Sequence, residues 1–129
     1  MTGEAERLVR ELVRRGWTSY CFGRQDDPVA LAAVHRGALW ADVVVWRGHD
    51  RAAAYRTLLM TGVDPLSVDR VVWHYLSDAE RTLRAALSIS ADAMAPVPYA
   101  IPVQCRIPEI EHRPWSMRPG ALRAGRADA

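Results

Sequence analysis

The sequence predicts an α+β domain, or a small three-layer α/β domain, with a sheet of three or four strands, flanking helices and a Pro-rich extended C-terminal arm. Three observations carry this prediction: an apolar stripe at helical spacing near the N-terminus, two runs of strand formers in the middle, and six of the eight prolines between Pro96 and Pro119. The length of 129 residues fits one domain. We therefore expect a single globular domain over residues 1–95, an arm packed on the body or on a partner over 96–119, and a flexible tail over 120–129.

The first predicted element is an amphipathic helix over residues 2–15. Acidic side chains stand in its first turn and Arg14 and Arg15 in its last, which suits the helix dipole, and Gly16 is a natural stop. The apolar residues recur at helical spacing and form one stripe: Ala5, Leu8, Val9, Leu12 and Val13.

A strand and a short helix are expected next. Residues Trp17–Phe22 are rich in strand formers, and Gly23 follows them. In residues 27–37, Asp27 is a candidate N-cap, Pro28 suits the first helical position, and the middle is rich in alanine. This composition favours a short helix that ends at Gly37.

The strongest strand signal covers Leu39–Arg47, and its uninterrupted apolar run predicts a central strand covered on both faces. The following Gly-His-Asp break has two interpretations. Gly48 permits a tight hairpin into a strand over Arg51–Thr57, whereas Asp50 would cap a helix over Ala52–Met60. The hairpin is slightly favoured, and residues 58–69 are then a loop.

A second clear strand is expected over Val71–Leu76. It runs into Ser77-Asp78-Ala79-Glu80, a capping box that predicts a helix immediately afterwards. Beyond Ile89 the prolines exclude a helix or a central strand. Several apolar side chains in this segment nevertheless favour an arm that is ordered to about Trp115.

Charge argues against a nucleic-acid partner. All 17 basic residues are Arg and none is Lys, a bias that a G/C-rich coding sequence explains. Residues 1–95 hold 12 Arg and 12 acidic residues, so the formal charge of +2 resides entirely in the C-terminal segment, with 5 Arg and 3 acidic residues. A neutral body offers phosphate no net attraction, and the acidic start of the helix after Ser77 would repel it.

Localisation and cofactors follow from what the sequence lacks. The longest apolar runs fall far short of the roughly 20 residues of a membrane span, and the acidic N-terminus is unlike a secretory signal. We therefore expect a cytoplasmic protein without membrane contact, in which Cys21 and Cys105 are reduced thiols. The dyad His49-Asp50 is interpreted as turn residues, so no metal site is predicted. No phosphate-binding glycine motif is present, and no cofactor is expected.

The best candidate site is an aromatic sheet face around Asp42. If the two strongest strands are neighbours, alternation places Asp42 with Trp40, Trp46, Trp73 and Tyr75, and His74 on the opposite face. A carboxylate desolvated among indoles could act as a general acid or base, with His74 or Tyr75 assisting. The favoured interpretation is that Asp42 bonds an Arg or a loop backbone while the indoles simply pack. A ligand or partner surface is predicted to comprise the exposed aromatic residues, with Trp115 of the arm: Trp40, Trp46, Trp73, Tyr75 and Trp115.

These residues favour a small cytosolic binding or regulatory module without a catalytic motif, whose partner is a second protein or a second copy in a homodimer. A small apolar ligand is compatible with the aromatic face. The alternative is a cofactor-free enzyme of isomerase, cyclase or lyase type that uses Asp42 as acid or base. Nucleic-acid binding ranks third. The sequence resembles no family whose motifs can be transferred residue by residue.

Overall fold

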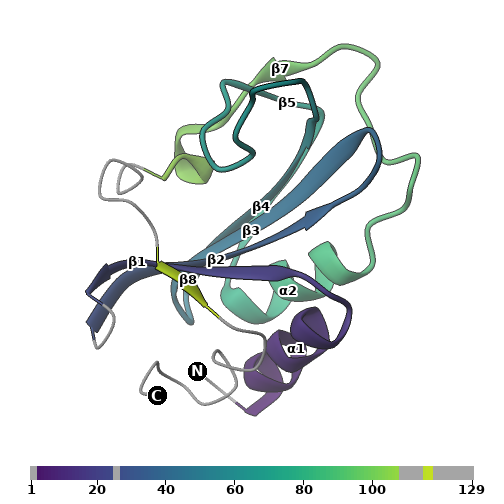
Figure 1. Ribbon diagram of the computed structural model, residues 1–129. Helices are drawn as coiled ribbons and strands as arrows, with labels where there is room; N and C mark the ends of the chain where they lie inside the picture. Colours follow the sequence, from purple (N-terminus) through teal and green to yellow (C-terminus); the bar gives the residue numbers. More distant parts are fainter. Residues whose placement is uncertain (1–2, 25–26, 108–114, 118–129) are drawn as a thin grey trace.

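An antiparallel sheet runs through the molecule, with two helices on one face and a small second sheet on the other (Figure 1). The computed structural model describes residues 3–24, 27–107 and 115–117. Five strands form the main sheet in the order β6-β4-β3-β2-β1, and the short β8 extends it as a sixth strand beside β1. The class is therefore α+β, and the expected count of three or four strands is wrong because two further segments pair into the sheet.

Short connections join most of the elements up to Leu87, and the exception is the loop of residues 59–69 between β4 and β5, close to the loop predicted over 58–69. The main sheet consists of β1 (Thr18–Arg24), β2 (Asp27–Arg36), β3 (Trp40–Gly48), β4 (Arg51–Leu58), β6 (Trp73–Ser77) and β8 (Trp115–Met117). The second sheet pairs β5 (Arg70–Val71) with β7 (Tyr99–Ala100), and the helices are α1 (Gly3–Arg14), α2 (Ala79–Leu87) and the short 3-10 helix η1 (Val103–Cys105).

The helices predicted over residues 2–15 and after Ser77 are confirmed as α1 and α2. In α1 four residues of the apolar stripe are buried and Val13 is half-buried. Gly16 follows the helix with a φ of 88°, a conformation that glycine adopts without steric cost. The N-cap of α2 is Asp78 rather than Ser77 of the predicted capping box: the carboxylate of Asp78 accepts a hydrogen bond from the backbone N–H of Arg81 at 2.8 Å.

The helix expected over residues 27–37 is wrong, because this segment is strand β2. Its central residues pair with β1 on one side and β3 on the other. Ala30 and Ala32 pack into the layer of the second sheet, whereas Ala33 packs into the layer of the helices. A strand between two partners and two packed layers outweighs the weak helical preference of alanine.

The favoured hairpin after Gly48 is confirmed. β3 and β4 pair in antiparallel register from Trp40 opposite Leu58 to Gly48 opposite Arg51, with an irregularity after Trp46. The helical alternative for Ala52–Met60 is therefore wrong, because Arg51–Leu58 form strand β4, which pairs with β3 on one side and with β6 on the other.

The strand expected over Val71–Leu76 is divided. Val71 belongs to β5 in the second sheet, and Trp73 begins β6 in the main sheet opposite Arg56. Val72 lies between them, and its backbone N–H donates to the carbonyl of Arg56 at 2.8 Å. The predicted strand therefore contributes residues to both sheets.

Two apolar cores result, one on each face of the main sheet. The helix-side core joins α1 and α2 to side chains that include Trp17, Val44 and Trp46. The opposite core joins the sheet to the second sheet and η1 through residues such as Tyr55 and Val71. Within the described residues, no helix is both long enough and apolar enough to cross a membrane.

The Pro-rich segment is described over residues 96–107 and 115–117. Ile101, Cys105 and Ile107 are buried in the core beside the second sheet. Residues 108–114 and 118–129 lie outside the described residues, so the extended arm over 96–119 and the tail over 120–129 stay predictions.

Candidate functional site

Asp42 and Arg56 form a buried ion pair at the centre of the main sheet. The two residues are opposite each other on β3 and β4, and they are 5% and 2% exposed. Arg56 Nε donates to Asp42 Oδ1 at 2.6 Å and Nη2 donates to Oδ2 at 3.0 Å. This two-pronged geometry is the strong form of an Arg–carboxylate pair.

The remaining donor group of Arg56 holds the chain that follows α2. Its Nη1 donates to the carbonyls of Ser90 at 2.8 Å and Ala91 at 3.2 Å, and its guanidinium carbon lies 4.7 Å from the ring centroid of Trp40. Both oxygens of Asp42 are thus engaged, and Asp42 lines neither of the two large cavities described below. The geometry supports a structural pairing role for Asp42 rather than a role as acid or base.

The register places the predicted aromatic residues on the helix-side face together with Asp42. Trp46 is nevertheless only 3% exposed, and Trp73 packs partly against the helix-side core. Tyr75 stacks on Trp73 with 6.5 Å between ring centroids and is 36% exposed at the edge of the sheet. Most of this aromatic face is therefore core, and its accessible part lies at β6. The side chain of Trp115 lies outside the described residues.

His74 lies on the opposite face of β6 and does not meet Asp42. It is opposite Tyr55, and its Nδ1 lies 2.8 Å from the hydroxyl oxygen of Tyr99 on β7. The three candidate catalytic residues are thus separated by the sheet, with Asp42 and Tyr75 on one side and His74 on the other.

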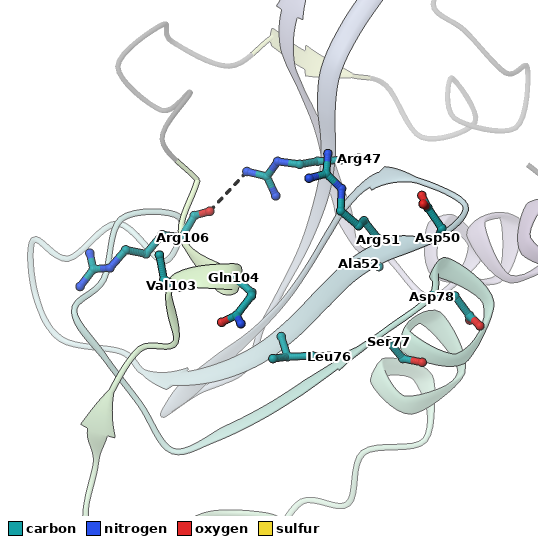
Figure 2. Close-up of a pocket in the computed structure, with 10 residues that line it drawn as sticks. All are labelled: Arg47, Asp50, Arg51, Ala52, Leu76, Ser77, Asp78, Val103, Gln104 and Arg106. Carbon is teal, nitrogen blue, oxygen red and sulfur yellow. Dashed lines mark hydrogen bonds between the residues drawn. The ribbon is translucent and has the colours of Figure 1, made fainter.

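A groove of about 730 Å³ opens at the turn between β3 and β4 (Figure 2). Arg47 from the end of β3 donates through Nη2 to the carbonyl of Arg106 at 3.3 Å, which joins the hairpin to the chain after η1. The lining residues come from the hairpin, the end of β6 and η1 with its flank: Arg47, Asp50, Arg51, Ala52, Leu76, Ser77, Asp78, Val103, Gln104 and Arg106. Sequence reasoning missed this groove, because the residues that join its two sides, Arg47 and Arg106, are 59 residues apart in the chain. The available signal was the Arg residues on both sides of the Gly-His-Asp turn.

A second cavity of about 630 Å³ lies at the other end of β4, against the loop that precedes β5. Met60 and Val63 contribute apolar surface to it. The loop is tied to the sheet by the hydroxyl of Tyr55, which donates to the carbonyl of Pro65 at 2.6 Å.

The fold and these sites define an α+β protein whose antiparallel sheet is covered on both faces and has β6 and β8 as its two edge strands. Comparisons with protein-family models, with curated proteins and with solved structures find no match. Within the part of the chain that the structure describes, no three His, Cys, Asp or Glu side chains gather as metal ligands would.

Both cysteine thiols are expected to be unreactive in the folded protein. Cys21 and Cys105 are buried, and burial raises the pKa of the Cys105 thiol from an ordinary value near 9 to about 11. We expect no reaction with a disulfide reagent at mildly alkaline pH until denaturant is added. Because the folded pKa is the higher one, the free energy of unfolding should begin to fall near pH 9 and continue to fall toward pH 11. Rapid labelling of the native protein would contradict this assignment.

Proposed function

We propose that the chain is a small cytosolic protein-binding module that forms a homodimer through the free edge of β6. The observation that carries this proposal is a sheet edge without a partner strand. β6 pairs with β4 on one side only. At the opposite end of the main sheet the edge strand is the shorter β8, which pairs with Ser19–Cys21 of β1. Within the described residues, no backbone hydrogen bond of Trp73–Ser77 is found outside the pairing with β4.

The composition of β6 makes this edge suitable for strand addition. Natural proteins protect free edges with lysine, proline or inward-pointing charge. β6 reads Trp-His-Tyr-Leu-Ser and contains none of these, and its middle residues His74, Tyr75 and Leu76 are exposed. An added strand would satisfy the outer backbone groups and cover the apolar surface of Tyr75 and Leu76.

A second copy of the chain fits this edge better than a charged partner would. In an antiparallel pairing centred on Tyr75, Trp73 would lie opposite Ser77 of the other copy, and no like charges would face each other. A two-fold symmetric contact of this kind is the commonest form of homodimer. Strand pairing alone buries a modest area, so we expect a dissociation constant in the micromolar range.

Light scattering across a concentration series tests the dimer. The mass should rise from 14.4 kDa toward twice that value as the protein concentration increases. Tyr75→Lys places a charge opposite its own copy across the two-fold axis and should keep the protein monomeric. Circular dichroism establishes that the variant is folded.

Leu39→Lys provides the matched control. Leu39 is 68% exposed and precedes β3 at its far end, so the same charge added there should leave the dimer intact. A wild-type protein that stays monomeric at high concentration would refute self-association. Equal dimerisation of the Tyr75→Lys variant would show that another surface is responsible.

A further inference from the structure

We propose that His74 makes the β6 dimer sensitive to pH, so that protonation of its imidazole between about pH 8 and about pH 5.5 separates the two copies. This inference rests on the proposed dimer and adds its regulation. His74 lies within the free edge strand β6, and its side chain is exposed in the single chain. Histidine is the side chain whose ordinary charge change falls in the physiological range of pH.

The symmetry of the strand pairing brings both copies of His74 to one face of the contact. With Tyr75 opposite its own copy, His74 lies opposite Leu76 of the other copy, and the two His74 side chains are diagonal neighbours. Diagonal neighbours across an antiparallel pair are about 7–8 Å apart. This separation is within the screening length of about 8 Å at physiological salt, so two protonated imidazoles would repel each other.

Leu76 of the other copy adds a second cost to the charged state. A neutral imidazole packs against an aliphatic side chain without loss, whereas a protonated one gives up part of its hydration there. Leu76 is 39% exposed in the single chain, so in the dimer this surface replaces water beside His74. Repulsion and desolvation therefore act in the same direction, and both oppose pairing of the protonated chains.

The hydroxyl of Tyr99 holds the imidazole at this face in both protonation states. The hydroxyl oxygen lies 2.8 Å from Nδ1 of His74, and the two rings meet edge to face with 5.6 Å between their centroids. A hydroxyl can donate to a neutral ring nitrogen and can accept from a protonated one, so this hydrogen bond survives protonation. The charge therefore stays at the contact rather than turning away into solvent.

The titratable groups that face His74 from neighbouring elements are neutral at these pH values. β4 places Tyr55 directly opposite, β7 contributes Tyr99, and η1, which packs beside β6, contains Cys105. Burial raises the pKa of Tyr55, the pKa of Tyr99 and the pKa of the Cys105 thiol, the last to about 11. These three groups therefore keep their protons throughout the range in which a histidine titrates.

The charged side chains around β6 have other partners. They gather beyond Leu76, around the groove at the β3–β4 turn, whose lining does not include His74. Arg106 in that lining is paired with Asp69 at 3.6 Å, and Asp78 caps α2. The other charged side chains of α2 belong to the helix layer on the opposite face of the sheet. A proton on His74 is therefore not balanced by a carboxylate, since the polar contact of its ring is with a hydroxyl.

Sedimentation equilibrium of the full chain at about pH 8 and about pH 5.5 tests the proposal. We expect the dissociation constant of the dimer to be about tenfold higher at the lower pH, because two like charges then lie at the contact. Raising the salt concentration to about 1 M shortens the screening length to about 3 Å and should restore most of the dimer at the lower pH. Circular dichroism at both pH values verifies that the chain stays folded.

Matched variants assign the effect to one residue. His74→Gln removes the titratable group, and its dimer should have the same dissociation constant at both pH values. His74→Arg carries a permanent charge and should dimerise at about pH 8 no more tightly than the wild type at about pH 5.5. His49→Gln replaces an exposed histidine of the β3–β4 turn and should leave the pH dependence unchanged.

The outcomes separate this inference from the dimer on which it rests. A wild-type dimer of equal strength at both pH values overturns the role of His74 and leaves the dimer in place. A pH dependence that persists in His74→Gln likewise overturns it, because another group must then titrate. A wild-type chain that stays monomeric at about pH 8 refutes the dimer itself, and its regulation with it.

Discussion

Replacing Arg56 with methionine should lower the free energy of unfolding by about 3–5 kcal/mol. The substitution leaves the Asp42 carboxylate without a partner in a position where it is 5% exposed. It also removes the donor that holds the carbonyls of Ser90 and Ala91, so the segment after α2 loses its attachment to the sheet. Urea denaturation followed by circular dichroism measures the loss.

The control is the same substitution in an exposed ion pair. Arg14 bonds Glu11 on the surface of α1 with 73% of its side chain exposed, and Arg14→Met should cost less than about 0.5 kcal/mol. The double variant Asp42→Leu with Arg56→Met should be more stable than Arg56→Met alone, because no unpaired charge remains buried. A loss at Arg56 as small as that at Arg14 would mean that solvent reaches the pair.

The second large loss of stability is expected on replacing Leu83, a residue of α2 that is fully buried in the helix-side core. Leu83→Ala removes three side-chain carbons, one methine and two methyl groups, and leaves a cavity, so the free energy of unfolding should fall by about 3 kcal/mol. The denaturation midpoint should move while the slope stays constant, since the two-state character is retained.

Leu39→Ala makes the identical chemical change at an exposed position and should alter stability by no more than about 0.5 kcal/mol. If Leu83→Ala proved equally mild, the helix would have to collapse onto the sheet and fill the cavity. A crystal structure of the variant would detect that movement.

The elements that could be predicted from the sequence are those whose signals are local. α1 has a complete apolar stripe with a glycine stop, and α2 has its cap residue Asp78, so neither depends on distant partners. The helix prediction for β2 was wrong because alanine has a second use besides helix formation. In β2 the small side chains let a packed layer approach the strand from each face. This use of alanine depends on the pairing of β2 with β1 and β3, which are not recognisable as its partners from the local sequence.

The candidate site was predictable only in part for the same reason. Alternation along β3 correctly associates Asp42 with Trp40 and Trp46, because strand periodicity is a local property. The identity of its partner depends on the register between β3 and β4, which places Arg56 rather than another Arg opposite Asp42. The groove depends on a still longer connection, between the hairpin and Arg106.

The distribution of aromatic residues between the two cores has a spectroscopic consequence. Trp17, Trp40, Trp46 and Trp73 all lie on the helix side of the main sheet, whereas Tyr55 and Tyr99 lie toward the second sheet. Indole emission from these four residues therefore reports on the helical layer. Tyrosine emission reports mainly on the opposite layer once Tyr75, which stacks on Trp73 on the helix side, is replaced by Phe. Recording both through a single denaturation distinguishes a molecule that melts as one unit from one that loosens one layer first.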